Sequence, residues 1–149
     1  MEYRYSGHSV YYTQYHVVWV TKFRRKVLNP GFAKYADTKI REIVERIEGV
    51  EIGELNIQTD HVHILLLIPP KYAVAKVVEI IKSNSTKLVR QKFPWLDKPY
   101  FNTSSLWSVG YFASTVGTNE EVIRKYVRYQ QNQDSGQAKL EFGSQVPRH

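Results

Sequence analysis

Two histidines separated by one residue, His61-Val62-His63, are the part of this sequence best suited to chemistry. On a β-strand, residues i and i+2 point to the same face, so the two imidazoles project together. Every second side chain from Val62 to Ile68 is apolar, which indicates that the opposite face packs against helices. A divalent metal ion would satisfy two imidazoles on an otherwise apolar strand. The alternative is a pair of hydrogen-bonded structural histidines at the end of a sheet.

A tyrosine and a glutamine near the C-terminus form the second half of a candidate site. Tyr126 and Gln130 are neighbours on a helix, and both fall on its apolar side, where a glutamine needs a polar partner. A phenol can attack phosphorus and become a phosphotyrosine. A metal held by two imidazoles and one amide oxygen keeps open positions for a phosphodiester. The alternative is a core tyrosine with a helix-capping glutamine. Tyr129 and Gln133 repeat the spacing one turn later.

The elements that would position these residues follow from hydrophobic periodicity and turn residues. We expect strands at Tyr15–Thr21, Val50–Gln58, His61–Ile68 and Leu106–Thr115, and helices at Phe32–Glu48, Ala73–Lys92 and from Thr118 or Asn119 to about Asn132. Thr59-Asp60 predicts a tight hairpin between the second and third strands. The order β-α-β-β-α-β plus a helix predicts an α+β, ferredoxin-like split βαβ fold. The first two helices would cover one face of an antiparallel sheet, with the histidines on the other.

The length of 149 residues suits one domain, which we place at residues 1–132, starting with a loose arm over residues 1–12 and followed by a polar, mobile tail at 133–149. The chain has no cysteine, which excludes a disulfide framework, a thiolate zinc site and a cysteine nucleophile. No apolar run is long enough for a bilayer span, and the first residues lack the apolar stretch of a signal peptide. We therefore expect a cytoplasmic protein.

The charge balance suggests a polyanionic partner. Lys and Arg number 21 against 14 Asp and Glu, which gives a formal net charge of +7. Such an excess most often serves nucleic-acid binding. The candidate DNA contacts are Lys22, Arg24, Arg25 and Lys26 after the first strand, and Lys82, Lys87 and Arg90 on the second helix. The alternative for each is an ordinary solvated charge.

Four segments together resemble a known family. They are YHVVWVTKFRRKVL at 15–28, TDHVHILL at 59–66, WSVGYFASTVG at 107–117 and IRKYVRYQ at 123–130. The chain resembles the small single-tyrosine HUH transposases of bacterial and archaeal insertion sequences, which move as single-stranded DNA. The resemblance extends from about Tyr15 to Gln131. The His-hydrophobic-His motif alone is weak, whereas the ordered set is specific.

The resemblance implies a role for each site residue. His61 and His63 match the two metal-binding histidines, Tyr126 the nucleophile and Gln130 the third metal ligand, with Mg²⁺ or Mn²⁺ as the expected ion. It also implies homodimers with joined sheets, in which the tyrosine helix can complete the partner's site. Such enzymes recognise DNA hairpins near the element ends and cleave single-stranded DNA. They leave a 5′-phosphotyrosine and a free 3′-OH, and need no nucleotide cofactor.

Two other functions remain open from the sequence. A domesticated relative would apply the same chemistry to genomic repeat hairpins, and the DNA flanking the gene would distinguish it. A non-catalytic ferredoxin-like nucleic-acid-binding module would keep the basic charge. Such a module has no need for His61, His63, Tyr126 and Gln130 together.

Overall fold

The computed structural model describes residues 4–6, 9–11, 13–22, 28–94, 106–115 and 120–134. Its elements, in chain order, are β1 (Arg4–Ser6), β2 (Ser9–Tyr11), β3 (Gln14–Val20), α1 (Pro30–Glu45), β4 (Glu51–Ile57), β5 (His61–Leu67), α2 (Val74–Lys92), β6 (Phe112–Ser114) and α4 (Glu120–Asp134). The α+β architecture of the prediction is confirmed.

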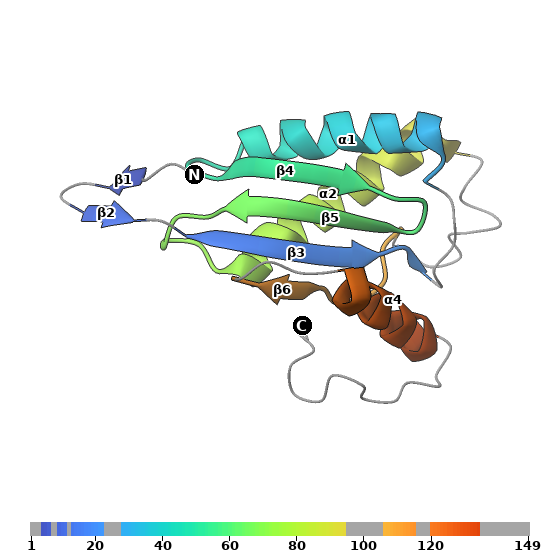
Figure 1. Ribbon diagram of the computed structural model, residues 1–149. Helices are drawn as coiled ribbons and strands as arrows, with labels where there is room; N and C mark the ends of the chain where they lie inside the picture. Colours follow the sequence, from blue (N-terminus) through green and yellow to red (C-terminus); the bar gives the residue numbers. More distant parts are fainter. Residues whose placement is uncertain are drawn as a thin grey trace.

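Four strands form one antiparallel sheet in the order β4-β5-β3-β6. Both β3 and β4 run antiparallel to β5, so the β3-α1-β4 unit is a parallel crossover that is split by the strand between them. The β5-α2-β6 unit is split in the same way by β3. Figure 1 shows α2 behind the sheet and α1 along the top of the view next to β4 and α2, whereas α4 lies beside β3 and β6.

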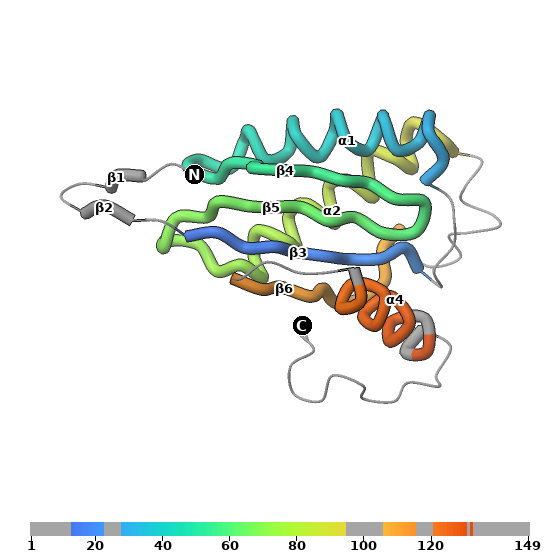
Figure 2. The backbone as a smooth tube through the Cα atoms, in the orientation of Figure 1, coloured from blue at the N-terminus to red at the C-terminus, as the bar shows by residue number. Residues whose placement is uncertain are grey.

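Local signals explain where α1 begins and where the chain turns after it. The side chain of Asn29 accepts a hydrogen bond from the backbone N–H of Phe32 at 3.1 Å, and Pro30 occupies the first helical position. Gly49, with a φ of 84°, follows the helix in a conformation that glycine adopts without strain. The backbone N–H of Gln58 then bonds to the carbonyl of His61 at 2.8 Å, which closes the predicted tight hairpin between β4 and β5 (Figure 2).

The sheet has a hydrophobic cluster on each face. Val17 and Trp19 of β3 share the larger cluster with α1, α2 and the apolar side of β5. Val18 and Val20, which alternate with them, pack with Tyr126 and other residues of α4 in a smaller cluster. The sheet is therefore covered by two helices on one face and partly by α4 on the other.

Three predictions need correction. The backbone of residues 4–6 and 9–11 is paired as β1 and β2, where we expected a loose arm. The predicted strand Leu106–Thr115 is a strand only at Phe112–Ser114, with one isolated bridge between Trp107 and Thr21. Around that bridge, the backbone of residues 106 and 108 still bonds to Lys22 and Val20, whereas the carbonyls of residues 108–110 accept from side chains. Residues 133 and 134 also belong to α4, where we expected the tail to begin.

Other predictions fall partly outside the described residues. The proposed caps Thr118 and Asn119 and residues 135–149 are among these. None of the helices in the described part of the chain is long and apolar enough to cross a membrane.

Candidate nuclease site

The two histidines lie on the face of β5 opposite α1 and α2. In the strand register, His61 is paired with Val20 of β3 and His63 with Val18. Directly paired residues point to the same face of a sheet. On the other side of β5, Asn56 of β4 is paired with His63. The side chains of His61 and His63 are both half-buried on this face.

Asp60 orients the first imidazole. Its carboxylate, itself buried, lies 2.8 Å from Nδ1 of His61, so Nδ1 carries the proton and donates it. This assigns the lone pair to Nε2, the atom available to a metal ion. Asp60 also lies in the turn before β5, where its backbone carbonyl accepts from the N–H of Thr21 at 3.0 Å.

His63 is in a less polar setting and has a free ring nitrogen. Its Nε2 is buried and has no hydrogen-bond partner in the described structure. Burial lowers the pKa of His63 below its usual 6.5, and nearby His16 and His61 add to this, while Glu54 opposes it. A neutral imidazole with an unsatisfied buried nitrogen is suited to accept a metal ion.

His16 lies beside the predicted pair. Its ring centroid is 5.7 Å from that of His63, and its Nδ1 is also buried without a hydrogen-bond partner among the described residues. A contact of 3.3 Å joins its Nε2 to the side-chain amide of Gln14. His16 is paired with Leu65, two residues after His63, so its ring lies on the histidine face.

The tyrosine and the glutamine of α4 contact each other, as their spacing predicts. Gln130 Nε2 donates to the hydroxyl of Tyr126 at 2.9 Å and lies 2.9 Å from the carbonyl of Val109. Ser108 donates its hydroxyl to Gln130 Oε1 at 3.3 Å. Tyr126 is fully buried and Gln130 is 3% exposed, so all the polar atoms of this pair are satisfied inside the protein.

The structure brings the two halves of the site to one face without joining them. Val18 and Val20 are the cross-strand partners of His63 and His61, and both belong to the buried cluster that contains Tyr126. In this conformation, however, Gln130 uses its amide on Tyr126 and on residues 108 and 109. Among the described residues, no group of three or more His, Cys, Asp or Glu side chains is placed to hold a metal ion.

Burial does not distinguish Tyr129 from Tyr126, because both side chains are buried. Tyr129 is 4% exposed and belongs to the same cluster on the sheet. What distinguishes Tyr126 is the hydrogen bond from Gln130. The side chain of Gln133 lies outside the described residues, so the second pair has no described counterpart to this bond.

The residues predicted to contact DNA differ in their solvent exposure. Lys87 is exposed on α2 and Arg90 is half-buried. Lys22 is half-buried after β3, and Arg24, Arg25 and Lys26 lie outside the described residues. Lys82 was predicted wrongly as a surface residue: it is 9% exposed, and its ammonium bonds to the carbonyls of Ser108 and Gly110. Lys82 is followed by Ser83 and Asn84, a polar pattern that is typical of a solvent-exposed helix face.

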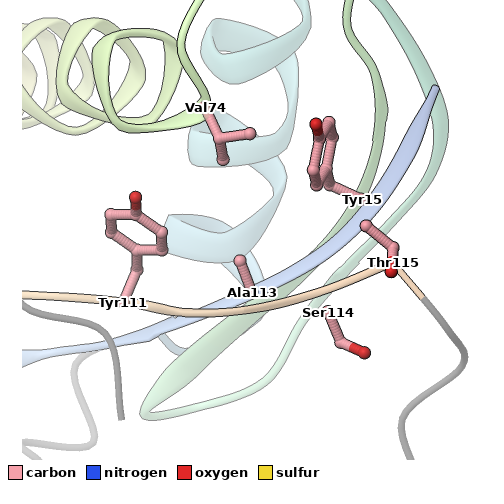
Figure 3. Close-up of a pocket in the computed structure, with 6 residues that line it drawn as sticks. All are labelled: Tyr15, Val74, Tyr111, Ala113, Ser114 and Thr115. Carbon is pink, nitrogen blue, oxygen red and sulfur yellow. The ribbon is translucent and has the colours of Figure 1, made fainter. Parts of the chain in front are cut away.

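A separate cavity of about 440 Å³ lies at the start of α2. Its lining residues are Tyr15, Val74, Tyr111, Ala113, Ser114 and Thr115 (Figure 3). Tyr15 and Ala113 are paired with Leu66 and Val17, which face the helices, so this cavity is not part of the histidine site.

Comparison with known proteins decides the family. A family model described as "Transposase IS200 like" matches residues 9–130. The chain belongs to this family. It is 31% identical over 128 residues to the transposase for insertion sequence element IS200 of Salmonella typhimurium, covering 86% of this chain and 83% of that protein. It is 29% identical over 126 residues to the ISDra2 transposase TnpA of Deinococcus radiodurans, covering 84% and 89%.

Solved structures agree with this assignment. The crystal structure of a candidate transposase from Deinococcus radiodurans R1 matches with a TM-score of 0.77 at 29% identity, over 85% of this chain and 97% of that one. A REP-associated tyrosine transposase bound to a REP hairpin shares the fold, with a TM-score of 0.51 at 15% identity, over 90% and 76%. As an IS200-like transposase, the chain belongs to enzymes of DNA transposition by insertion sequences.

The sequence did not reveal three features of the site. These are the carbonyl of Val109 and the hydroxyl of Ser108, which bond to Gln130, and the ammonium of Lys82, which bonds to the backbone of Ser108. Nothing in residue type or spacing marks a backbone carbonyl. The glutamine on an inward face was the one signal that a polar partner had to exist.

Proposed function

We propose that this IS200-like transposase cleaves and rejoins single-stranded DNA through a covalent bond between Tyr126 and a 5′-phosphate. The observation that carries this proposal is that Tyr126 lies in one buried cluster with Val18 and Val20, the cross-strand partners of His63 and His61. A phenol and two imidazoles on one sheet face are the groups that a metal-assisted transesterification requires.

Of the two expected ions, Mg²⁺ and Mn²⁺, the donor set suits Mn²⁺ better, because imidazole favours softer ions than Mg²⁺. Asp60 bonds to Nδ1 of His61, which leaves Nε2 of that ring for the metal ion. His63 has a buried Nε2 without a hydrogen-bond partner in the described structure. Gln130 would supply an amide oxygen as the third ligand. When bound, the ion supplies Lewis acidity toward the scissile phosphate.

The remaining chemistry belongs to the chain. The phenolic oxygen of Tyr126 attacks phosphorus and loses its proton, the bond from phosphorus to the 3′ oxygen breaks, and that oxygen leaves as a 3′-OH. The phosphotyrosine conserves the energy of the phosphodiester, so rejoining is the reverse attack by a 3′-OH. Tyr126 is fully buried here. The side chains around Gln130 must therefore rearrange before substrate can meet the phenol.

DNA hairpins and a second copy of the chain complete the proposal. The related tyrosine transposase with a bound REP hairpin supports hairpin recognition. The basic balance of +7 supports binding of the phosphate backbone. A homodimer with joined sheets follows from the resemblance, and sedimentation equilibrium of the full chain tests it.

The test is a search for a covalent adduct. Full-length protein is incubated with single-stranded hairpin oligonucleotides taken from the DNA flanking its gene, with Mn²⁺, Mg²⁺ or EDTA. We expect an SDS-resistant protein–DNA band with either metal and none with EDTA. Binding without any adduct would contradict the proposal and favour the non-catalytic module. Flanking DNA that carries scattered genomic repeats rather than subterminal palindromes would favour the domesticated relative.

A further inference from the structure

Lys82 holds a buried segment of backbone from one side. Its Nζ lies 2.8 Å from the carbonyl oxygen of Ser108 and 2.7 Å from that of Gly110. The side chain is 9% exposed on α2, which packs on the sheet face opposite the histidines. Burial of an ammonium is costly, and two short charge-assisted hydrogen bonds are what offsets that cost here.

Gln130 holds the same segment from the other side. Its Nε2 lies 2.9 Å from the carbonyl of Val109, and its Oε1 accepts from the hydroxyl of Ser108 at 3.3 Å. The carbonyls of residues 108 and 110 therefore point to Lys82, whereas the carbonyl between them points to Gln130. This alternation is the ordinary geometry of an extended backbone, in which successive carbonyls face opposite ways.

The first residue of the segment also bonds to β3, and its last residue has an unusual backbone conformation. The backbone N–H of Ser108 donates to the carbonyl of Val20 in β3 at 2.8 Å. Gly110 has a φ of 99°, a conformation that side-chain-bearing residues rarely adopt. The direction in which the carbonyl of Val109 points is thus set by Lys82 on one side and by the strand on the other.

We infer that Lys82 is a positioning residue for Tyr126 and Gln130. It aligns residues 108–110, these align the amide of Gln130, and Gln130 holds the phenol at 2.9 Å. This inference rests on the proposed transesterification, for which Tyr126 and Gln130 are the reacting and ligating groups. It replaces the expectation that Lys82 contacts DNA.

The inference is tested with Lys82→Met, Lys82→Arg and the control Lys76→Met, which removes an exposed charge from the same helix. Three quantities are measured: the single-turnover rate of adduct formation, the affinity for a hairpin oligonucleotide at two salt concentrations, and the NMR signals of the Gln130 side-chain amide without DNA. We expect Lys82→Met to lower the rate about 10- to 100-fold, as small misplacements of reacting groups do. The hairpin affinity and its salt dependence should stay unchanged.

The Gln130 amide signals separate positioning from mere stability. We expect them to shift in Lys82→Met, to return toward wild type in Lys82→Arg, and to be unaffected in Lys76→Met. An unchanged amide signal and rate in Lys82→Met would overturn the inference. A weaker affinity with a smaller salt dependence would show instead that Lys82 contacts phosphate.

Two further outcomes are decisive. If Lys82→Met does not fold, Ser108→Ala removes only the hydroxyl that reaches Gln130 Oε1. It should shift the same amide signals and lower the same rate, and the absence of both changes would overturn the inference. If the wild-type protein forms no adduct at all, the proposed function fails, and the Gln130 signals alone then decide the role of Lys82.

Discussion

His61 and His63 are alike in sequence but differ in their surroundings. Asp60 bonds to one ring, while the other has a buried nitrogen with no hydrogen-bond partner among the described residues. The sequence predicted that both imidazoles share one face. The predicted turn also gives the correct register between β4 and β5. A two-residue turn at Thr59-Asp60 places Asn56 opposite His63. The carboxylate of Asp60 was harder to assign, since aspartate is equally common as a turn residue.

Asp60→Asn keeps the size of the side chain but removes its charge. We expect the Mn²⁺ affinity of the protein to fall about 10- to 100-fold, the usual effect of removing a carboxylate that orients a ligating histidine. Isothermal titration calorimetry measures this. The control is Asp37→Asn, which removes an exposed carboxylate paired with Arg41 on α1. Equal affinities in wild type and Asp60→Asn would contradict the orienting role.

The lowered pKa of His63 predicts a pH dependence of stability in metal-free protein. The folded state resists protonation at this ring, so between the lowered pKa and 6.5 the unfolded state binds more protons. The free energy of unfolding should therefore be fully retained above 6.5 and fall as the pH drops through the lowered pKa. Urea unfolding in EDTA, from about pH 7.5 to about pH 5, tests this. His63→Gln should flatten the dependence, and an equal slope in both proteins would refute the assignment.

At the scale of elements, hydrophobic periodicity predicts where the helices and strands lie, whereas tertiary contacts influence where they end. The helices and the hairpin strands were predicted close to their observed ends because amphipathic patterns and turn residues are local signals. The strand around residue 110 was predicted too long. Its β-branched and aromatic residues favour a strand, but its carbonyls at Val109 and Gly110 accept hydrogen bonds from Gln130 and Lys82 rather than from a neighbouring strand. No local pattern contains those contacts.

Gly110→Ala tests how tightly this segment is specified. A side chain at a φ of 99° is strained, so we expect a loss of about 1–2 kcal/mol in the free energy of unfolding. Gly31→Ala is the matched control, since the added methyl meets only ordinary contact with Asn29 in the first turn of α1. It should be neutral or stabilising. Chemical denaturation measures both, and equal effects would contradict the strain at Gly110.

At the scale of the whole molecule, the charge and the fold point to the same use. The sheet presents its histidines on the face that α1 and α2 leave open, and the family is one of DNA transposition. Composition predicted a polyanionic partner without saying which face binds it. The buried position of Lys82 shows why: charge counting does not separate a solvated lysine from one that bonds to backbone carbonyls.

The exposed charges of α2 predict how DNA affinity responds to salt. If Lys87 contacts a phosphate, Lys87→Ala should lower the slope of log affinity against log salt by about 1 and weaken binding to all sequences alike. Lys34→Ala on α1 removes an equally exposed charge on another helix and should leave the slope unchanged. Fluorescence anisotropy with a hairpin oligonucleotide provides the slopes. Identical slopes in the two variants would exclude a phosphate contact at Lys87.

The nature of the covalent link tests the central claim most directly. The protein is incubated with a hairpin substrate and Mn²⁺, the adduct is digested, and mass spectrometry identifies the peptide that carries the 5′-phosphate. We predict that the phosphate is on Tyr126, that Tyr126→Phe abolishes the adduct and that hairpin binding survives. A phosphate on Tyr129, or an adduct that persists in Tyr126→Phe, would contradict the account.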